Sequence, residues 1–485
     1  MADEEKVKVA VLGAGPAGMA AAYSLAGRGV PVTVLEKEDQ VGGLARTIRH
    51  QGFRFDLGSH RFFTKHERVR TFVEELLGDE LITVSRSSKI IFQGRYFDYP
   101  PTFWNAFSGL GPFTSARIFG AYLKQRILPD RRETKTLEDW MTRQFGSVMY
   151  ELFFKTYTEK VWGTPCREIA AIWATQRIQG MSLAAAIRQA LLPADNPPAS
   201  MIDRFLYPRL GIGRICEKMA EAFPEAVKLS TRVTGLRPDG ERGWVVAGEG
   251  PSGKIQVTAE QVISTLPINE LVKMLSPAPP PPVREAAAAL AFRDLILVAL
   301  MFDCEPLTAE SWIYIPNHEI IFGRFHEPAN FSRELSPPGQ TSLVFDLFCF
   351  RTDPIWTWPD DQLTEAVVAD LRKIGMVKAE MLKRIIGAKV IRAERAYPLH
   401  RLGYEEPLGV IKSYLDAAGR QGLRTVGREG QFAYLNIDHA LVAGMLAAEN
   451  ALGARHEIDS VLADDSYLEA AGRVRASEAS DGRKA

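Results

Sequence analysis

The feature that most constrains this chain is a glycine-rich turn between two apolar strands near its start. Residues 7–12 alternate and are rich in β-branched side chains, and a G-x-G-x-x-G turn begins at Gly13. An Ala/Leu-rich helix over residues 19–26 follows, and then a second strand over residues 30–35 that ends at Glu36. This order of strand, glycine turn, helix, strand and acid predicts a dinucleotide-binding βαβ unit.

The glycines of this turn allow the backbone to approach a pyrophosphate, which then lies at the positive end of the helix. Glu36 falls where such units place the acid that binds a ribose. A tight turn without a ligand is the alternative, and the second strand and the acid favour binding. The residues expected to contact the dinucleotide here are Gly13, Gly15, Ala17, Gly18, Glu36 and Lys37.

A second glycine pair follows in the segment V-G-G-L-A-R at 41–46, and F-R-F-D-L-G-S-H occupies 53–60. With these motifs the chain resembles the FAD-binding group of amine oxidases, phytoene desaturases and protoporphyrinogen oxidases. Those proteins show G-G-x-x-x-T and then G-x-x-x-D-x-G-x-H at these places. The resemblance implies FAD rather than NAD, with contacts from Gly42, Gly43, Leu44, Ala45, Arg46, Gly58, Ser59 and His60.

The C-terminal part of the chain contains further segments that are expected to bind FAD. Residues 424–430 read as a short strand running into glycines, and Asn436 and Asp438 are placed to cap an Ala-rich helix over 440–452. A helix N-terminus aimed at a flavin would stabilise negative charge on the reduced ring. Strands at 227–233 and 261–267 return to the same domain. Further FAD contacts are expected from Val233, whose role is implied by the resemblance, and from Gly427, Arg428, Asn436, Ile437 and Asp438.

These segments predict an α/β fold in which a discontinuous Rossmann-like FAD-binding domain is interrupted by two insertions. One insertion is mostly helical by its hydrophobic period, and the other is a mainly antiparallel sheet domain. The expected divisions are FAD binding at 1–67, 211–270 and 416–470, a helical substrate or cap domain at 68–210, a sheet domain at 271–415, and a flexible tail at 471–485.

The composition limits the choice of partners. The 59 Lys and Arg residues balance 59 Asp and Glu residues, so no overall positive field attracts nucleic acid or anionic lipid, and an anionic ligand must be held by local arginines. No apolar run is long enough to cross a bilayer, and the N-terminus does not read as a signal peptide. Four scattered cysteines suggest neither disulfides nor a metal site. We expect a cytoplasmic protein that needs no metal.

Five further motifs bear on the chemistry. An aromatic run at 153–162 is followed by Arg177, Arg324, Tyr397 in A-Y-P, and Tyr434. The aromatic run alone is as well explained by a helix packed in the core. In this order, however, the chain resembles the UDP-galactopyranose mutase family along nearly its whole length. That resemblance implies a nucleotide-sugar mutase that interconverts pyranose and furanose forms of an NDP-hexose through an adduct of the sugar with reduced flavin N5, without net redox.

The resemblance also implies roles for single residues. Phe153 and Tyr157 would pack the base, and Trp162 would line the sugar site. The diphosphate would be clamped by Arg177 and Arg324 and hydrogen-bonded by Tyr397 and Tyr434, while His60 would lie beside the flavin and Arg428 would contact FAD. A diphosphate in a neutral protein does require planar bidentate donors. Taken singly, each arginine is more often a surface ion pair, and His60 could simply end a turn.

Several positions depart from the mutase pattern, including Phe63, Phe432, Ile437 and the segment 328–330. The base therefore stays open between UDP, GDP and dTDP, and the sugar stays open as well. An FAD-dependent oxidase or desaturase is the main alternative, because such enzymes share the FAD framework and because the aromatic and basic stretch 103–128 could lie on a membrane surface. A non-catalytic FAD-binding protein is a third. The expected partners are an NDP-sugar and a reductant such as NAD(P)H or a reductase, without nucleic acid or stable membrane insertion; a homodimer is left open.

Overall fold

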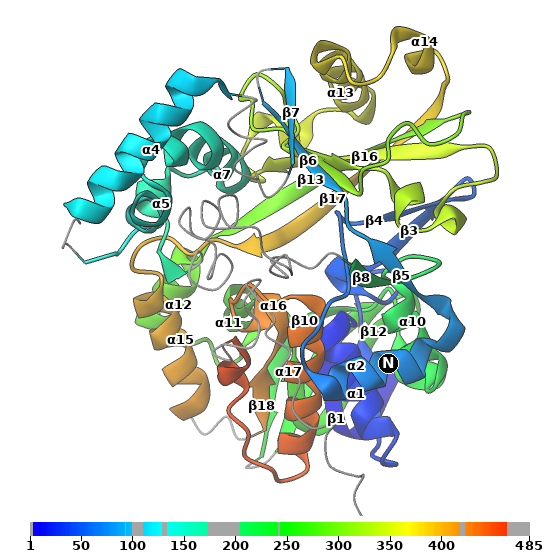
Figure 1. Cartoon of the computed structure of the whole chain (residues 1–485). Helices are drawn as coiled ribbons and strands as arrows, with labels where there is room; N and C mark the ends of the chain where they lie inside the picture. Colours follow the sequence, from blue (N-terminus) through cyan, green and yellow to red (C-terminus); the bar gives the residue numbers. More distant parts are fainter. Residues whose placement is uncertain are drawn as a thin grey trace, which may run out of the picture.

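The computed structural model describes residues 3–92, 94–98, 110–128, 133–172, 204–240, 243–417 and 422–462. Two seven-stranded sheets lie one above the other, and a group of helices flanks the upper one (Figure 1). The glycine-rich turn predicted from the sequence belongs to the lower sheet.

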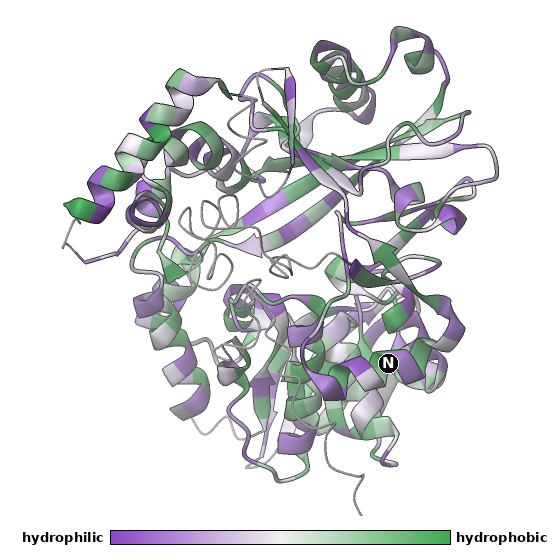
Figure 2. Cartoon of the chain, in the orientation of Figure 1, coloured by the Kyte–Doolittle hydropathy of each residue, from purple (hydrophilic) through white to green (hydrophobic). Residues whose placement is uncertain are grey.

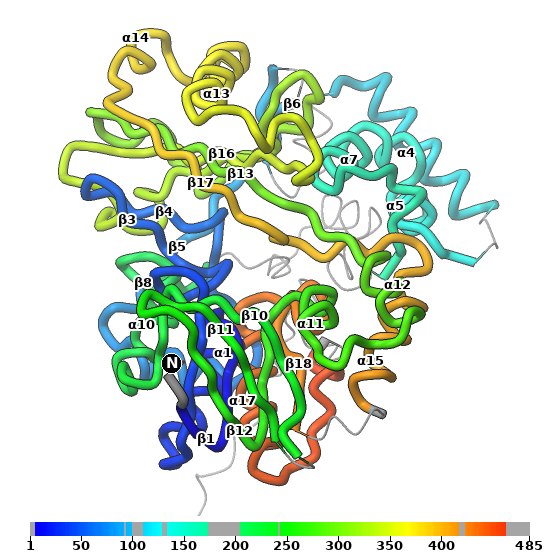
Figure 3. The backbone as a smooth tube through the Cα atoms, turned by 180° about the vertical axis from the view of Figure 1, so that it is seen from behind, coloured from blue at the N-terminus to red at the C-terminus, as the bar shows by residue number. Residues whose placement is uncertain are grey.

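The first sheet has five parallel strands and an antiparallel extension. Its parallel part has the spatial order β9 (Val227–Lys228), β2 (Val32–Leu35), β1 (Asp3–Leu12), β12 (Gly253–Ser264) and β18 (Leu423–Thr425). The antiparallel strands β10 (Arg232–Asp239) and β11 (Gly243–Gly250) extend it beside β12, as the view from behind shows (Figure 3). These strands come from three distant parts of the chain, which confirms the discontinuous Rossmann-like architecture; the exact domain boundaries stay a prediction.

Helices cover both faces of this sheet because the side chains of β1 alternate between them. Val9 and Val11 pack into a core with the helices α1 (Pro16–Ala26), α2 (Glu67–Leu77), α10 (Arg214–Glu221) and α17 (Ile437–Ala451). Ala10 and Leu12 face the other core, which includes α11 (Ile268–Met274), α12 (Pro281–Ala289) and α15 (Glu405–Ala417). A Cβ on Gly444 would lie 2.1 Å from the Ala17 carbonyl oxygen, so this glycine permits close contact between α17 and α1.

The second sheet has the order β17 (Ile385–Pro398), β13 (Phe292–Phe302), β16 (Thr341–Cys349), β15 (Arg324–His326), β14 (Trp312–Tyr314), β6 (Ser88–Phe92) and β7 (Arg95–Asp98). Every residue of β13 is buried, and alternate side chains enter two different cores. One core lies under α13 (Asp360–Ile374) and α14 (Ala379–Leu382). The other contains Phe53 and Phe55 of the hairpin β3 (Thr47–His50)–β4 (Phe53–Asp56).

In the described parts of the inserted segment 68–210, helices occur together with strands that were not predicted. The segment contains α4 (Pro112–Ile127), α5 (Leu137–Phe145), α6 (Ser147–Met149), a π-helical turn (Tyr150–Lys155) and α7 (Thr156–Trp162). It also supplies β6 and β7 to the second sheet, and β5 (Leu81–Ser85) pairs with β8 (Arg204–Pro208). Short apolar runs such as Ile90–Ile91 do not distinguish a strand from a helix by periodicity, which is why these strands were missed.

Other element boundaries moved by a few residues. The strand expected at 227–233 is two strands, β9 and β10, interrupted at Ser230, whose φ is +50°. The helix expected at 440–452 begins at Ile437, with Asn436 as its N-cap residue. Among the residues that the structure describes, no helix is both long and apolar enough to cross a membrane.

Candidate cofactor and substrate site

The glycine turn lies at the carboxyl end of β1, between β2 on one side and β12 on the other. Open α/β sheets bind their ligands at such a point, where the chain leaves neighbouring strands in opposite directions. Gly13 has a φ of +96°, and a Cβ there would lie 2.1 Å from the Thr265 Oγ1. Only glycine fits this position, because both the backbone conformation and the space exclude a side chain.

The N-terminus of α1 is prepared for an anion. Gly15 is its N-cap residue, no side chain caps it, and its first turn contains no acidic residue. The N–H groups of a first helical turn have no acceptor within the helix and attract a phosphate. The Ala14 N–H instead donates to the Glu36 Oε2 at 2.7 Å, which holds this carboxylate at the end of β2 beside the turn.

A second glycine turn faces the first. Gly43 has a φ of +52°, and a Cβ on it would lie 3.0 Å from the Gly15 Cα. Arg46 follows within the same turn and donates from Nη1 to the Gly43 carbonyl at 2.9 Å, with Glu38 3.7 Å away. The two turns therefore form a narrow backbone cradle with a cation at its side.

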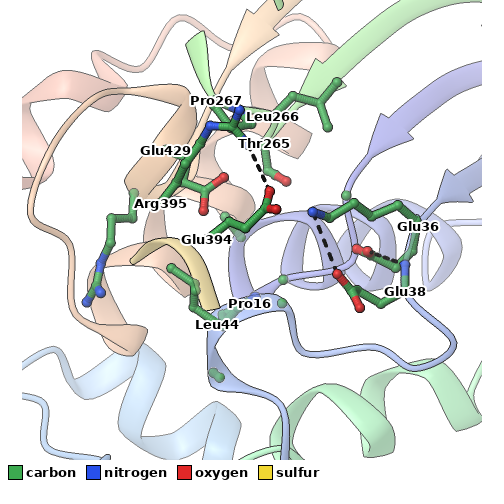
Figure 4. A pocket seen from close by; sticks show the side chains of 18 of the residues that line it. Pro16, Glu36, Glu38, Leu44, Thr265, Leu266, Pro267, Glu394, Arg395 and Glu429 are labelled. Carbon is green, nitrogen blue, oxygen red and sulfur yellow. Dashed lines mark hydrogen bonds and ion pairs between the residues drawn. The ribbon is translucent and has the colours of Figure 1, made fainter. Parts of the chain in front are cut away.

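A cavity of about 670 Å³ extends from this cradle, which is within the range of cofactor sites. Figure 4 shows Glu36 and Glu38 on one side of it, and Glu394, Arg395 and Glu429 on the other. Backbone glycines, an open helix N-terminus and a ribose-side carboxylate are the groups that a dinucleotide requires. The residues present therefore fit FAD.

Most of the predicted cofactor residues line this cavity: Gly13, Gly15, Ala17, Glu36, Lys37, Gly43, Leu44, Ala45, Arg46, His60, Val233, Gly427, Arg428, Asn436 and Ile437. Gly18, Gly42, Gly58, Ser59 and Asp438 are not among its lining residues. Gly18 instead permits close packing, because its Cβ would lie 2.0 Å from the Gly13 carbonyl oxygen. Asp438 is 1% exposed in the first turn of α17.

Another side of the cavity is lined by residues that were not predicted from the sequence. Thr265, Leu266 and Pro267 enter it from the end of β12, and Arg395 and Glu429 enter from β17 and α16 (Gly427–Gly430). Burial raises the pKa of Glu429 to about 7. Arg395 has a φ of +54° and donates its backbone N–H to the buried Asp294 Oδ1 at 2.7 Å. Glu429 directly follows the predicted Arg428 in the segment 424–430 but was not itself predicted, whereas Arg395 belongs to no recognisable local motif.

His60 follows the buried Asp56 by four residues, and its backbone N–H donates to the Gly58 carbonyl at 2.8 Å. Asp56 accepts hydrogen bonds from Thr47, Tyr207 and the Ile212 N–H, which ties the hairpin β3–β4 to the segment after β8. The His60 side chain lines the cavity, and its Nδ1 is buried without a hydrogen-bond partner within the described chain. Burial, with the nearby charges of Arg428 and Arg324, lowers the pKa of His60 to about 3, so the imidazole is neutral.

Arg324, which was predicted to clamp a diphosphate, is not a free cation, because it is paired with a carboxylate. It lies directly opposite Asp346 across β15 and β16, and both its Nε, at 2.7 Å, and its Nη2 donate to the Asp346 Oδ2. Asp346 is fully buried. The pair is formally neutral, and the Nη1 of Arg324 makes no hydrogen bond to any residue in the described part of the chain. That edge can still donate to a ligand.

A lone charge within an otherwise buried strand was the available signal for this pairing. The strand β16 reads T-S-L-V-F-D-L-F-C, and Asp346 is its only ionised residue. A buried charge needs a partner, and the facing residue of a neighbouring strand is the nearest one.

Aromatic side chains gather near Arg324, whose charge interacts with Tyr157, Tyr314 and Tyr397. Tyr157 meets Tyr314 edge-on at 5.2 Å, Tyr397 stacks on Tyr434 at 5.6 Å, and Trp162 meets both Tyr397 and Tyr434 edge-on. The Arg428 guanidinium lies 4.9 Å from the ring centre of Tyr434. The Tyr157 and Tyr397 hydroxyls make no hydrogen bond to a described residue, so they are available to a ligand.

Two of the predicted substrate residues do not belong to this aromatic group: one lies in a core, and the other lies outside the described residues. Phe153 is 6% exposed and packs edge-on against Phe97 at 5.7 Å, in the core of the helical segment. That position fits the core interpretation of the aromatic run, and contact of Phe153 with a base stays a prediction. Arg177 lies outside the described residues. The roles of Tyr157, Trp162, Arg324, Tyr397 and Tyr434 in binding a substrate stay predictions.

Comparisons with known proteins agree with this site. A family model described as flavin containing amine oxidoreductase matches residues 16–413. Protoporphyrinogen oxidase 1 of Spinacia oleracea chloroplasts is 23% identical over 452 residues, which cover 85% of this chain and 78% of the oxidase.

Two solved structures show the same fold. Reduced UDP-galactopyranose mutase superposes with a TM-score of 0.81 at 23% identity, over 94% of this chain and 98% of the mutase. Cyclohexylamine oxidase from Brevibacterium oxydans superposes with a TM-score of 0.64 at 15% identity, over 92% of this chain and 98% of the oxidase. Because the family model spans most of the chain, and because the cavity fits a flavin dinucleotide, the chain belongs to the flavin-containing amine oxidoreductase family, with FAD as its cofactor.

Proposed function

We propose that this flavoprotein is an NDP-sugar mutase that interconverts pyranose and furanose forms of a hexose without net redox. The observation that supports this most is the set of polar donors at and near Arg324. It comprises the Nη1 edge of Arg324 and the hydroxyls of Tyr157 and Tyr397, which have no hydrogen-bond acceptor among the described residues. Such donors suit a diphosphate and do not suit an apolar polyene.

In this proposal the residues of the chain bind and orient the substrate and exclude water. Arg324, held in one orientation by Asp346, donates to the diphosphate, and the tyrosine hydroxyls donate to its remaining oxygens. Trp162 and Tyr434 exclude water from the side of the sugar. His60 is neutral, so it can donate or accept a hydrogen bond without adding charge. A reduced flavin, when bound, supplies the nucleophile that a mutase of this kind needs.

The direct test uses protein whose FAD has been reduced with dithionite. Reduced protein is incubated separately with UDP-, GDP- and dTDP-hexoses, and the sugars are analysed by anion-exchange chromatography and NMR. A furanose product with one of them, absent when the FAD is oxidised, supports the proposal. Absence of furanose with the whole panel contradicts it. The same panel identifies the base, and replacing dithionite by NAD(P)H tests the proposed reductant.

A second candidate is an oxidase, because the matched spinach relative is named as one and covers most of this chain. An oxidase must pass electrons from its substrate to the flavin. Anaerobic addition of a porphyrinogen or an amine, followed by bleaching of the flavin absorbance, would favour this candidate. Bleaching without furanose formation in the first experiment would replace the mutase proposal.

The remaining expectations about the surroundings of the protein stay proposals: a cytoplasmic location, an NDP-sugar as partner, a reductase or NAD(P)H as electron source, and a homodimer as an open alternative.

A further inference from the structure

Helix α4 lies along the outer edge of the molecule, away from both sheets (Figure 1). Ile118 and Tyr122, one turn apart, are its buried residues, and Ile118 belongs to the core of the helical segment. The helix packs on α6, where a Cβ on Gly146 would lie 3.0 Å from the Tyr122 backbone nitrogen. One face of α4 is therefore anchored to the protein.

The opposite face is apolar although it meets solvent. Phe119, Leu123 and Ile127 are four residues apart and form one line along the helix. Together with Phe113 and Leu128, they are between 44% and 77% exposed. Five of the eleven large exposed hydrophobic side chains in the described chain thus belong to this one helix and its C-cap. Figure 2 shows hydrophobic residues at the free end of α4.

The same face is basic. Arg117, Lys124 and Arg126 are exposed, and residues 110–128 contain no acidic residue. None of the three forms an ion pair with a residue that the structure describes. Arg117 and Lys124 are seven residues apart, so they lie on one line beside the apolar one. Since the whole chain has a net charge of zero, this local charge is not part of a general positive surface.

We propose that α4 is a docking surface for an anionic lipid bilayer, in which the helix lies flat in the headgroup region. Apolar side chains interspersed with Lys and Arg, without acidic residues, are typical of helices that bind this interface. The charge complementarity favours an anionic bilayer over a second copy of the chain, because two copies of this face would bring like charges together. The inference does not rest on the proposed mutase function, and lipid binding by α4 would also suit the oxidase candidate.

The test is co-sedimentation of the full-length FAD-containing protein with lipid vesicles. We expect binding to vesicles that contain phosphatidylglycerol and much weaker binding to vesicles of phosphatidylcholine alone. Each basic residue near an anionic surface contributes about fivefold to partitioning, so Arg117→Glu/Lys124→Glu should lower it by at least about tenfold. Added salt should also release the protein, because it screens exposed charges.

The apolar contribution is tested with Phe113→Ser/Ile127→Ser, which should lower partitioning by a similar factor. The matched control is Ile386→Ser, because Ile386 is an exposed residue of similar size on β17, outside α4, and its replacement should have no effect. Flavin absorbance of each variant verifies that the site is intact.

Three outcomes would overturn the inference: equal sedimentation with both kinds of vesicle, sedimentation unaffected by the α4 substitutions, or no sedimentation at all. If the last is accompanied by a concentration-dependent doubling of the native mass that Phe113→Ser/Ile127→Ser abolishes, a second copy covers this face instead.

Discussion

The chemistry available to Arg324 is set by one neighbouring residue. In the sequence it is a candidate for holding a diphosphate, but in the fold Asp346 faces it across two strands and neutralises its charge. The same carboxylate also restrains the guanidinium, so that a ligand meets an arginine that is already oriented. Preorganisation of this kind lowers the entropy that binding must overcome.

The first prediction concerns this pair. Arg324→Met should destabilise the protein by about 3–5 kcal/mol, because it leaves Asp346 buried without a counter-charge. The double variant Arg324→Met/Asp346→Asn should regain most of this stability, while neither variant binds a nucleoside diphosphate well. Urea unfolding and calorimetric titration measure the two effects. Retention of diphosphate binding by the double variant would show that Arg324 does not contact the ligand.

The second prediction concerns Glu429, whose pKa is raised to about 7 by burial. A carboxyl group that holds its proton more tightly in the folded state favours folding less as the pH rises. Its contribution should therefore fall between the unfolded pKa, about 4.5, and about 7. Glu429→Gln should remove this loss of stability with rising pH. Above about pH 7, its free energy of unfolding should exceed that of the natural protein by about 1–3 kcal/mol.

Urea unfolding of the natural protein and of Glu429→Gln, both with FAD bound, at about pH 5 and about pH 8 tests whether stability changes with pH in this direction. A difference in stability between the two proteins that does not grow with pH would mean that Glu429 titrates normally.

At the level of elements, the site depends on how α7 is attached to the second sheet. The Lys160 Nζ donates to the carbonyl oxygens of Ile315, Asn317 and Phe322, at 3.2, 2.7 and 2.7 Å. These carbonyls belong to the connection between β14 and β15, which leads directly to Arg324. Burial lowers the pKa of Lys160 to about 7, opposed by Asp370 and Glu319.

The third prediction follows from this attachment. Lys160→Met should destabilise the protein by about 1–3 kcal/mol, because it leaves buried carbonyl oxygens without donors. It should also weaken nucleotide binding, because Tyr157 on α7 and Arg324 after the connection would no longer be held together. Lys155→Met is the matched control, since Lys155 forms no hydrogen bond or ion pair within the described chain. Equal effects of the two substitutions would contradict a specific role for Lys160.

A comparison of the predicted helices and strands with the observed ones shows where sequence patterns stop being informative. The βαβ unit was predicted with its three elements in place and their starts within about four residues, because glycine spacing and alternation are strong local signals. The strands β6 and β7 were not predicted, since β6 joins the sheet by pairing with β14, more than 200 positions away, and β7 pairs only with β6. Phe153 illustrates the same limit, because core packing and ligand packing select the same aromatic side chains.

At the level of the whole molecule, the cofactor cavity joins parts of the chain that are far apart in sequence. Its walls come from residues 13–46, 231–274, 351–395 and 427–440, and from His60. A ligand that contacts all of these segments stabilises their mutual arrangement, and not a single element.

The fourth prediction is that removal of FAD lowers the melting temperature and that FAD in excess restores it. A ligand present at about 100 times its Kd contributes about 2.7 kcal/mol to folding stability. Riboflavin, which lacks the diphosphate and adenosine, is the control and should stabilise much less. Equal stabilisation by both compounds would contradict the role of the glycine cradle.

The sequence by itself determined the dinucleotide unit and the α/β class, because these depend on glycines, an acid and strand patterns at short spacing, and its resemblance to known flavoproteins implied FAD. Only the tertiary structure decided that Arg324 is neutralised by Asp346, that Glu429 and Arg395 line the cavity, and that α4 exposes an apolar and basic face. These properties depend on strand register and on which face of an element another element covers. Both arise from contacts between distant segments, which local sequence does not specify.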